Sequence, residues 1–217
     1  MFYALMKAVA LAIARLFFRL EAHGLEHVPR KGPVLLVANH RSFLDPLVVG
    51  ASAPRPLHFM AKAELFSVPI LGAAIRRLHT LPVRRAGADP KSLRLALRIL
   101  EDGNALLIFP EGTRGKEEEF LEGKGGAGML AVLSGAPVVP VYIEGSGRAL
   151  PRGKFLPRPA KIVVRFGSPL SFVGQGNGRR KFRSTEVSRE MMTAIARLKT
   201  EAAGSVAGRL AYAVGHP

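Results

Sequence analysis

Two side chains able to perform acid–base chemistry, His40 and Asp45, stand five residues apart in the polar segment 39–46. A histidine whose ring is held by a carboxylate is a general base of suitable strength near neutral pH. Asp45 could turn back and accept the Nδ1–H of His40, which would leave Nε2 free to take a proton from a hydroxyl group. The carboxylate would also stabilise the imidazolium formed in the transition state. The structural alternative is that His40 caps the preceding strand or the following helix.

The chain lacks the usual nucleophiles that work beside such a base. It contains no cysteine, which also excludes disulfides and cysteine-ligated zinc. A Gly-x-Ser-x-Gly segment, the turn that presents the nucleophilic serine of many hydrolases, is absent as well. The nucleophile would then belong to the substrate. A base that deprotonates a substrate alcohol suits direct acyl transfer.

A second polar loop, residues 109–114, follows another short apolar run. Gly112 permits a tight turn that presents backbone N–H groups. Thr113 offers a hydroxyl and Arg114 a planar guanidinium, and this combination matches a phosphate group. Glu111 would either orient Arg114 or accept a hydrogen bond from a substrate hydroxyl. The same residue types are ordinary in surface turns, so the loop taken alone also fits a structural role.

Both loops follow apolar runs that are typical of buried strands. Strands that alternate with helical patterns predict an α/β fold with a mixed, largely parallel sheet flanked by helices. Ligands in such folds gather at loops beyond the strand ends. The predicted strands are residues 33–39, 57–61, 80–83, 105–109, 138–143 and 161–166, and the predicted helices are residues 69–77, 90–101, 126–134 and 186–202, the last preceded by a mobile basic loop over 174–183.

Residues 1–22 are strongly apolar and helix-prone, but Lys7, Arg15 and Arg19 interrupt them. The longest clean apolar stretch between these cations, residues 8–14, is far shorter than the roughly 20 residues a membrane span needs. At about 100° per residue the three cations fall within one third of a helix circumference. We predict an amphipathic helix over residues 1–22 that lies in a membrane interface, followed by an α/β domain over residues 23–217. A helix packed in a soluble core is the alternative. The side chains expected nearer the acyl chains are Leu5, Val9, Ile13, Phe17 and Leu20.

The 32 lysines and arginines against 16 acidic residues give a net charge of +16. Such a charge suits nucleic acid, an anionic membrane or a phosphate-bearing substrate. A nucleic-acid-binding protein should interleave aromatic and basic residues, but the chain has three tyrosines and no tryptophan. The basic clusters in the first helix and in residues 174–183 favour an anionic membrane surface, at about 1 kcal/mol for each basic residue near it. We expect no nucleic acid as partner.

Two further patterns point to no ligand of their own. His23 and His27 have a spacing that zinc can use, but no third ligand accompanies them, and we expect no metal site. Residues 123–128 fit the glycine pattern of dinucleotide-binding turns. They follow an acidic stretch instead of a strand, so they are interpreted as structural or substrate-facing.

Residues 39–46 read Asn-His-Arg-Ser-Phe-Leu-Asp-Pro and residues 109–114 read Phe-Pro-Glu-Gly-Thr-Arg. In this order and spacing they resemble the NHxxxxD and FPEGTR motifs of the glycerolipid acyltransferase family, of the 1-acylglycerol-3-phosphate acyltransferase type. A K-x-E-L signature follows at residues 62–65, and an apolar strand with an early proline at 139–145 resembles the fourth motif. The second motif departs from the family pattern, with His79 in place of glycine and Arg84 in place of aspartate. The resemblance covers about residues 22–171.

The resemblance implies that His40 is the general base and Asp45 its orienting partner, within an acyltransferase domain over residues 23–217. The donor would be acyl-CoA or an acyl carrier protein thioester, used as a co-substrate without any cofactor. The acceptor would be the sn-2 hydroxyl of 1-acylglycerol-3-phosphate (lysophosphatidic acid), giving phosphatidic acid. Another lyso-lipid acceptor, such as a lyso-ornithine lipid or a lysophospholipid, is the alternative. The enzyme would lie peripherally on the cytoplasmic face of the cell membrane, and the implied substrate-binding residues are Lys62, Arg85, Glu111, Gly112, Thr113 and Arg114.

Overall fold

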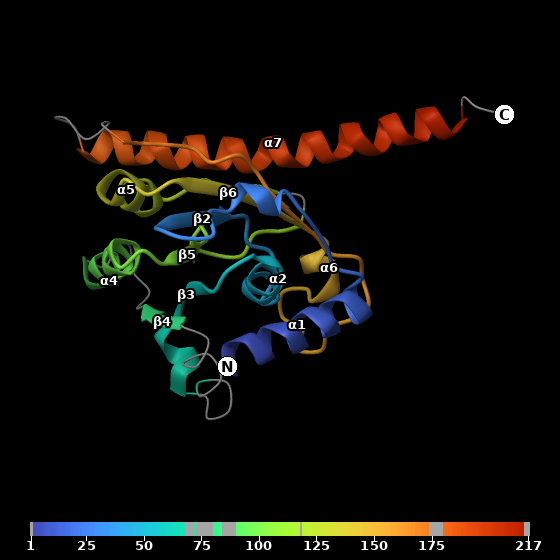
Figure 1. Cartoon of the computed structure of the whole chain (residues 1–217), viewed down its shortest axis with the longest axis horizontal. Coiled ribbons are helices and arrows are strands. Elements are labelled where there is room, and N and C mark those ends of the chain that lie inside the picture. The colour runs from blue at the N-terminus through green and yellow to red at the C-terminus, as the bar shows by residue number, and fades with distance from the viewer. Residues whose placement is uncertain are drawn as a thin grey trace.

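The computed structural model of the chain describes residues 2–67, 72, 80–83, 90–117, 119–173 and 180–214. Seven strands form a sheet in the order β1-β7-β6-β2-β5-β3-β4 (Figure 1). β2 (Val34–Ala38) lies in the middle, parallel to β6 (Val138–Glu144) on one side and to β5 (Ala105–Ile108) on the other. β3 (Leu57–Lys62) and β4 (Thr80–Val83) continue the parallel part. The carboxyl ends of these five strands therefore meet at one edge of the sheet.

The two strands at the other end of the sheet run in the opposite direction. β7 (Val163–Phe166) runs antiparallel to β6, and β1 (Glu21–His23) pairs in parallel with β7. The predicted mixed, largely parallel sheet is thereby confirmed.

Helices cover both faces of the sheet, because β2 is apolar on both. Its residues are all buried and alternate in direction: Val34, Leu36 and Ala38 join one core cluster, and Leu35 and Val37 join the other. α1 and α2 pack on the first face, and α4, α5 and α7 on the second, so that α1 and α7 lie on opposite sides of the sheet (Figure 1). The helices are α1 (Phe2–Phe18), α2 (Asp45–Ser52), α4 (Pro90–Glu101), α5 (Gly125–Ser134), α6 (Ser146–Ala149) and α7 (Arg180–Val214), with short 3-10 turns at Leu25–His27 and Ala63–Ser67.

The first helix is shorter than residues 1–22, because the chain turns after Phe18. Arg19 adopts a left-handed conformation (φ 46°), and the Leu20 N–H bonds to the Ala14 carbonyl. The chain then enters β1, where the Glu21 N–H donates to the Ile162 carbonyl. None of the described helices combines the length and hydropathy that crossing a membrane requires.

Two other predicted segments differ from the structure or fall outside it. α7 begins at Arg180, so residues 180–183 are helical and their assignment to a basic loop is wrong. Residues 174–179 lie outside the described part of the chain, as does the helix predicted over 69–77 apart from Gly72. α2, α6 and β1 were not predicted.

The glycine-rich segment 123–128 serves helix packing. A Cβ on Gly128 would lie 1.9 Å from the carbonyl oxygen of Ser184 on α7, so only glycine allows α5 and α7 this approach. The Ser188 hydroxyl, also on α7, accepts the Gly128 N–H at 2.9 Å and donates to the Lys124 carbonyl at 2.8 Å. A serine of α7 thus satisfies polar backbone groups at the start of α5.

Candidate active site

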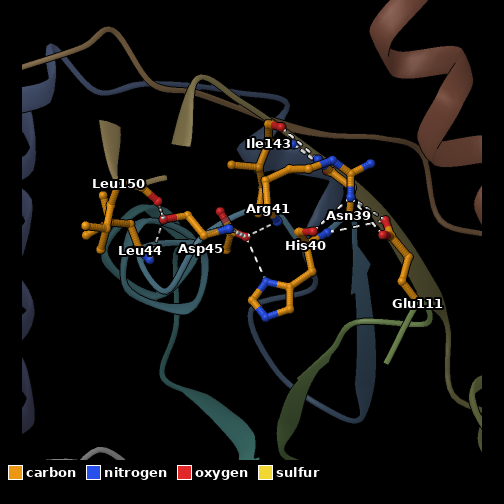
Figure 2. Close-up of polar contacts among 9 residues, drawn as sticks. Asn39, His40, Arg41, Leu44, Asp45, Glu111, Ile143 and Leu150 are labelled. Atoms are coloured by element: carbon orange, nitrogen blue, oxygen red, sulfur yellow. Dashed lines mark hydrogen bonds and ion pairs between the residues drawn. The ribbon is translucent and has the colours of Figure 1, made fainter. Parts of the chain in front are cut away.

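His40 and Asp45 lie together at the carboxyl edge of the sheet, directly after β2 (Figure 2). Asp45 is the first residue of α2, and its Oδ2 lies 2.8 Å from Nδ1 of His40. The Asp45 side chain is fully buried, whereas that of His40 is 18% exposed. A buried carboxylate that receives the Nδ1–H fixes the ring tautomer and leaves Nε2 as the basic nitrogen.

The same carboxylate oxygen also holds the loop that carries the histidine. Asp45 Oδ2 accepts the backbone N–H groups of Arg41 and Ser42, at 2.7 and 2.8 Å. Ser42 is not available as a nucleophile, because its buried hydroxyl donates to the Leu150 carbonyl at 3.0 Å and accepts the Leu44 N–H at 3.2 Å. The site thus offers His40 a partner on one nitrogen and no hydroxyl nucleophile from its own loop.

Two contacts join this loop to the neighbouring strands. The His40 ring stacks on Phe109, the residue directly after β5, with ring centroids 4.1 Å apart and planes at 19°. The Asn39 side chain bonds both backbone groups of Ile143 on β6, donating to the carbonyl at 2.8 Å and accepting the N–H at 2.7 Å. Each of these contacts restrains the position of the histidine relative to the sheet.

A buried ion pair, which the sequence did not reveal, connects the two motif loops. Nη1 of Arg41 lies 2.9 and 2.7 Å from the two carboxylate oxygens of Glu111, and both side chains are buried. Burial raises the pKa of Glu111, and the charge of Arg41 and its hydrogen bonds counter part of that rise. The Glu111 carboxylate also accepts the His40 backbone N–H at 3.4 Å. Glu111 therefore holds Arg41, and the expectation that it orients Arg114 is wrong.

The remainder of the second loop faces outward. Gly112 takes a left-handed φ of 64°, and its N–H donates to the Phe109 carbonyl at 3.0 Å. Gly112 and Thr113 are both exposed. The guanidinium carbon of Arg114 lies 3.8 Å from the centroid of the Phe43 ring. This cation–π contact ties Arg114 to the His40 loop. Burial and the nearby charge of Arg152 lower the pKa of Arg114, and Asp45 opposes this effect.

The other candidate cations are placed only in part. Lys62 is the last residue of β3, at the same edge of the sheet, although its side chain lies outside what the structure describes. Arg85 lies wholly outside the described residues, as do His79 and Arg84 of the altered second motif. Within the described ranges, no group of three or more histidine and acidic side chains is placed to hold a metal ion.

The fold and the site define an α/β protein with a histidine–aspartate pair at the carboxyl edge of its sheet, beside a second loop that carries Arg114. The family model described as Acyltransferase matches residues 19–144, and the chain belongs to this family.

Named relatives agree with this membership. The 1-acyl-sn-glycerol-3-phosphate acyltransferase of Bacillus subtilis (strain 168) is 30% identical over 151 residues, which cover 69% of this chain and 73% of the relative. A chloroplastic 1-acyl-sn-glycerol-3-phosphate acyltransferase of Arabidopsis thaliana is 34% identical over 142 residues, but the match spans only 39% of its length and 63% of this chain. A chloroplastic 1-acyl-sn-glycerol-3-phosphate acyltransferase of Brassica napus is likewise matched over only 40% of its length.

The crystal structure of the 1-acyl-sn-glycerophosphate (LPA) acyltransferase PlsC from Thermotoga maritima has the same fold. Its TM-score is 0.74 at 28% sequence identity, and the alignment covers 91% of this chain and 79% of that one.

Proposed function

We propose that the protein is a membrane-associated O-acyltransferase that moves a fatty acyl group from acyl-CoA or acyl carrier protein to the sn-2 hydroxyl of 1-acylglycerol-3-phosphate, giving phosphatidic acid. The observation that carries the proposal is the 2.8 Å contact between His40 Nδ1 and the fully buried Asp45 carboxylate. Membership of the Acyltransferase family and relatives named for this reaction support the choice of substrates.

In the proposed reaction the acceptor hydroxyl attacks the thioester carbonyl while His40 Nε2 takes its proton. The Asp45 carboxylate stabilises the imidazolium that forms. Collapse of the tetrahedral intermediate breaks the carbon–sulfur bond, and the imidazolium returns the proton to the leaving thiolate. The new ester bond joins the acyl carbon to the acceptor oxygen, so no acyl group is carried by the enzyme.

The acceptor phosphate would bind at the outward face of the second loop. Arg114 presents a guanidinium that is already held against Phe43, and such preorganisation lowers the conformational cost of binding a phosphate. Thr113, exposed in the same turn, adds a hydroxyl donor. Lys62 and Arg85 complete the proposed cationic set, Lys62 from the end of β3. Glu111 contributes indirectly, by holding Arg41 and the His40 backbone.

Membrane association would use α1. Ala14 and Phe18 are buried against the domain, whereas Val9, Ile13, Leu16 and Phe17 are exposed. An exposed apolar helix face of this kind suits insertion at the level of lipid headgroups. Arg15 and Arg19 are exposed beside it. Leu20 is buried in the core of the domain, so the prediction that it lies near the acyl chains is wrong. Lys7 faces the domain as well, where it donates to the Ala53 carbonyl. Placement on the cytoplasmic face of the cell membrane follows from the proposed donors.

The same chemistry on another lyso-lipid is the second candidate. The observation that favours it is the altered second motif, in which His79 and Arg84 replace the glycine and aspartate of the family pattern.

The proposal is tested by transfer from a labelled long-chain acyl thioester to lysophosphatidic acid in detergent micelles, with the wild type beside His40→Ala. We expect phosphatidic acid from the wild type and a loss of about 10²–10⁴-fold in the variant. A folded His40→Ala protein with near-native turnover would contradict the mechanism. If neither protein forms product, lyso-ornithine lipid and lysophospholipid acceptors are assayed in the same way, and product from one of them supports the second candidate.

A further inference from the structure

The loop between α6 and β7, residues 151–161, displays two large apolar side chains to solvent. Phe155 is 91% exposed and Leu156 is 85% exposed. Neighbouring residues 152–159 are all exposed, so these two side chains project without any cover from the domain. Such a display is unfavourable in water and marks a surface that another apolar phase covers.

The loop is nevertheless held firmly at both ends. The Lys154 N–H bonds the Pro151 carbonyl at 3.1 Å, and the Arg158 N–H bonds the Ala149 carbonyl at 2.8 Å. Arg158 Nε donates to the Arg148 carbonyl at 2.7 Å. These bonds lie on either side of Phe155 and Leu156. The two side chains therefore stand at the tip of an anchored turn.

The charge of the loop has one sign. Residues 151–161 contain four cations and no acidic residue. Lys161 pairs with Glu21 on β1 at 2.7 Å, which leaves Arg152, Lys154 and Arg158 exposed on either side of the apolar tip. An apolar tip between cations complements an anionic lipid bilayer, whose acyl region accepts the apolar side chains and whose phosphates attract the charges.

The loop lies on the same side of the molecule as α1 and the candidate active site. Pro157, next to the tip, lines a cavity of about 450 Å³ together with Ile13 and Phe17 of α1 and with Leu44 and Leu47 around the start of α2. In Figure 1 the segment that follows α6 passes beside α1. Ten large hydrophobic side chains are exposed in the part of the chain that the structure describes, and eight belong to this one region: Val9, Ile13, Leu16, Phe17, Phe43, Leu47, Phe155 and Leu156.

We propose that residues 151–161 form a second membrane-insertion element, which places Phe155 and Leu156 in the acyl region of an anionic bilayer while Arg152, Lys154 and Arg158 contact headgroup phosphates. One helix in the interface leaves the protein free to roll about the helix axis. A second contact, from the loop, removes that freedom and turns the His40 edge of the sheet toward the lipid surface. The inference extends the proposed function, which supplies the reason for an active site to face lipid, but its test does not depend on catalysis.

The absence of tryptophan gives a direct test. Phe155→Trp in the full chain makes a single-tryptophan protein, and Val173→Trp, at an exposed apolar position outside this region, is the matched control. Each protein is mixed with phosphatidylcholine vesicles containing phosphatidylglycerol. We expect a blue shift of the emission and quenching by lipids brominated on the acyl chain for Trp at 155 and neither at 173. Vesicle-bound protein without a shift at 155, or no binding of the chain to vesicles, would overturn the proposal.

Substitution gives a second measure. We expect Phe155→Ser with Leu156→Ser to weaken partition onto the anionic vesicles roughly tenfold or more, and each of Arg152→Gln and Lys154→Gln to weaken it about fivefold. Leu133→Ser with Val173→Ser removes the two exposed apolar side chains outside the region and should leave partition unchanged. Equal partition of the two double variants contradicts the inference. A shift at 155 produced by acyl carrier protein without vesicles would assign the loop to that protein instead. Acyl transfer in micelles is measured separately, so failure here leaves the proposed reaction standing.

Discussion

Nη1 of Arg41 contacts both carboxylate oxygens of Glu111, at 2.9 Å from Oε1 and 2.7 Å from Oε2, although the two residues are 70 positions apart in the sequence. The same Arg41 nitrogen donates to the His40 carbonyl at 2.8 Å. The Gly115 N–H donates to that carbonyl as well, at 2.9 Å. The ion pair thus joins the loop after β2 to the loop after β5, and the backbone of the candidate base lies at the junction.

Breaking this ion pair should destabilise the whole domain. In Glu111→Gln the Arg41 charge stays buried without its counter-charge, so we expect the free energy of unfolding to fall by about 3–5 kcal/mol. The matched control is Glu101→Gln, which makes the same chemical change at an exposed position of α4. Urea denaturation of the three proteins measures the difference. Equal midpoints for Glu111→Gln and Glu101→Gln would mean that the pair does not hold the two loops.

His40 and Asp45 should behave as one unit in kinetics. We expect Asp45→Asn to lower turnover by about 10²–10⁴-fold, because an amide cannot stabilise the imidazolium as a carboxylate does. The double variant His40→Ala/Asp45→Asn should be no slower than His40→Ala alone, since the aspartate acts through the histidine. Turnover is measured with folded proteins, as judged by circular dichroism. Multiplicative losses in the double variant would show that Asp45 acts separately.

Arg114 should matter only for acceptors that carry a phosphate. We expect Arg114→Ala to lower kcat/KM for lysophosphatidic acid by about 10-fold or more, mainly through KM, which corresponds to a lost charge-assisted contact. Transfer to monoacylglycerol, which has no phosphate, should be little changed. Phe43→Ala should give a smaller loss of the same kind, because it removes the ring that supports the guanidinium. Equal losses with both acceptors would place Arg114 outside the phosphate site.

The parts of the fold and site that were predicted depend on local signals. β2 was recognised because its residues form an unbroken apolar run that ends in a polar loop, and the structure buries all of them. The bounds of α4 follow from a proline start and an amphipathic period. His40 and Asp45 were paired because five residues allow a turn to bring them together. What depends on strand order was missed: Arg41 meets Glu111 only because β2 and β5 are neighbours.

Elements whose sequences carry weak signals were missed as well. β1 has only three residues, and two of them are exposed. It forms because β7 provides an edge with which its backbone can pair. α2 reads as an apolar run with β-branched residues, which suits a strand as well as a helix, and Asp45 at its first turn was interpreted only as a partner for His40. Here tertiary context decides between conformations that the local sequence permits.

Tyr142 should make the domain sensitive to alkali. Burial, followed by the charges of Glu144 and Glu117, raises the pKa of Tyr142 to about 12. The neutral form is therefore favoured in the folded state, and its stabilising contribution is present below the ordinary pKa near 10 and is lost as the pH rises toward 12. At about pH 11 we expect this loss to reach about 1.4 kcal/mol relative to about pH 9. Tyr142→Phe should lack this loss of stability. Urea denaturation of the wild type and of Tyr142→Phe at about pH 9 and about pH 11 measures the difference. Parallel declines would contradict the assignment.

Two glycines two residues apart in α5 should respond oppositely to alanine. In Gly128→Ala the new Cβ meets backbone atoms of α7, 1.9 Å from the Ser184 carbonyl oxygen and 2.9 Å from the Ser188 nitrogen. α7 must move away, which also weakens the bond between the Gly128 N–H and the Ser188 hydroxyl. We expect a loss of about 1–3 kcal/mol or more in the free energy of unfolding. Gly126→Ala meets nothing within 4 Å and should gain up to about 1 kcal/mol from the higher helix propensity of alanine. Thermal and urea unfolding of both variants measure the contrast. If Gly128→Ala were as stable as Gly126→Ala, α5 and α7 could not pack as closely as the structure has them.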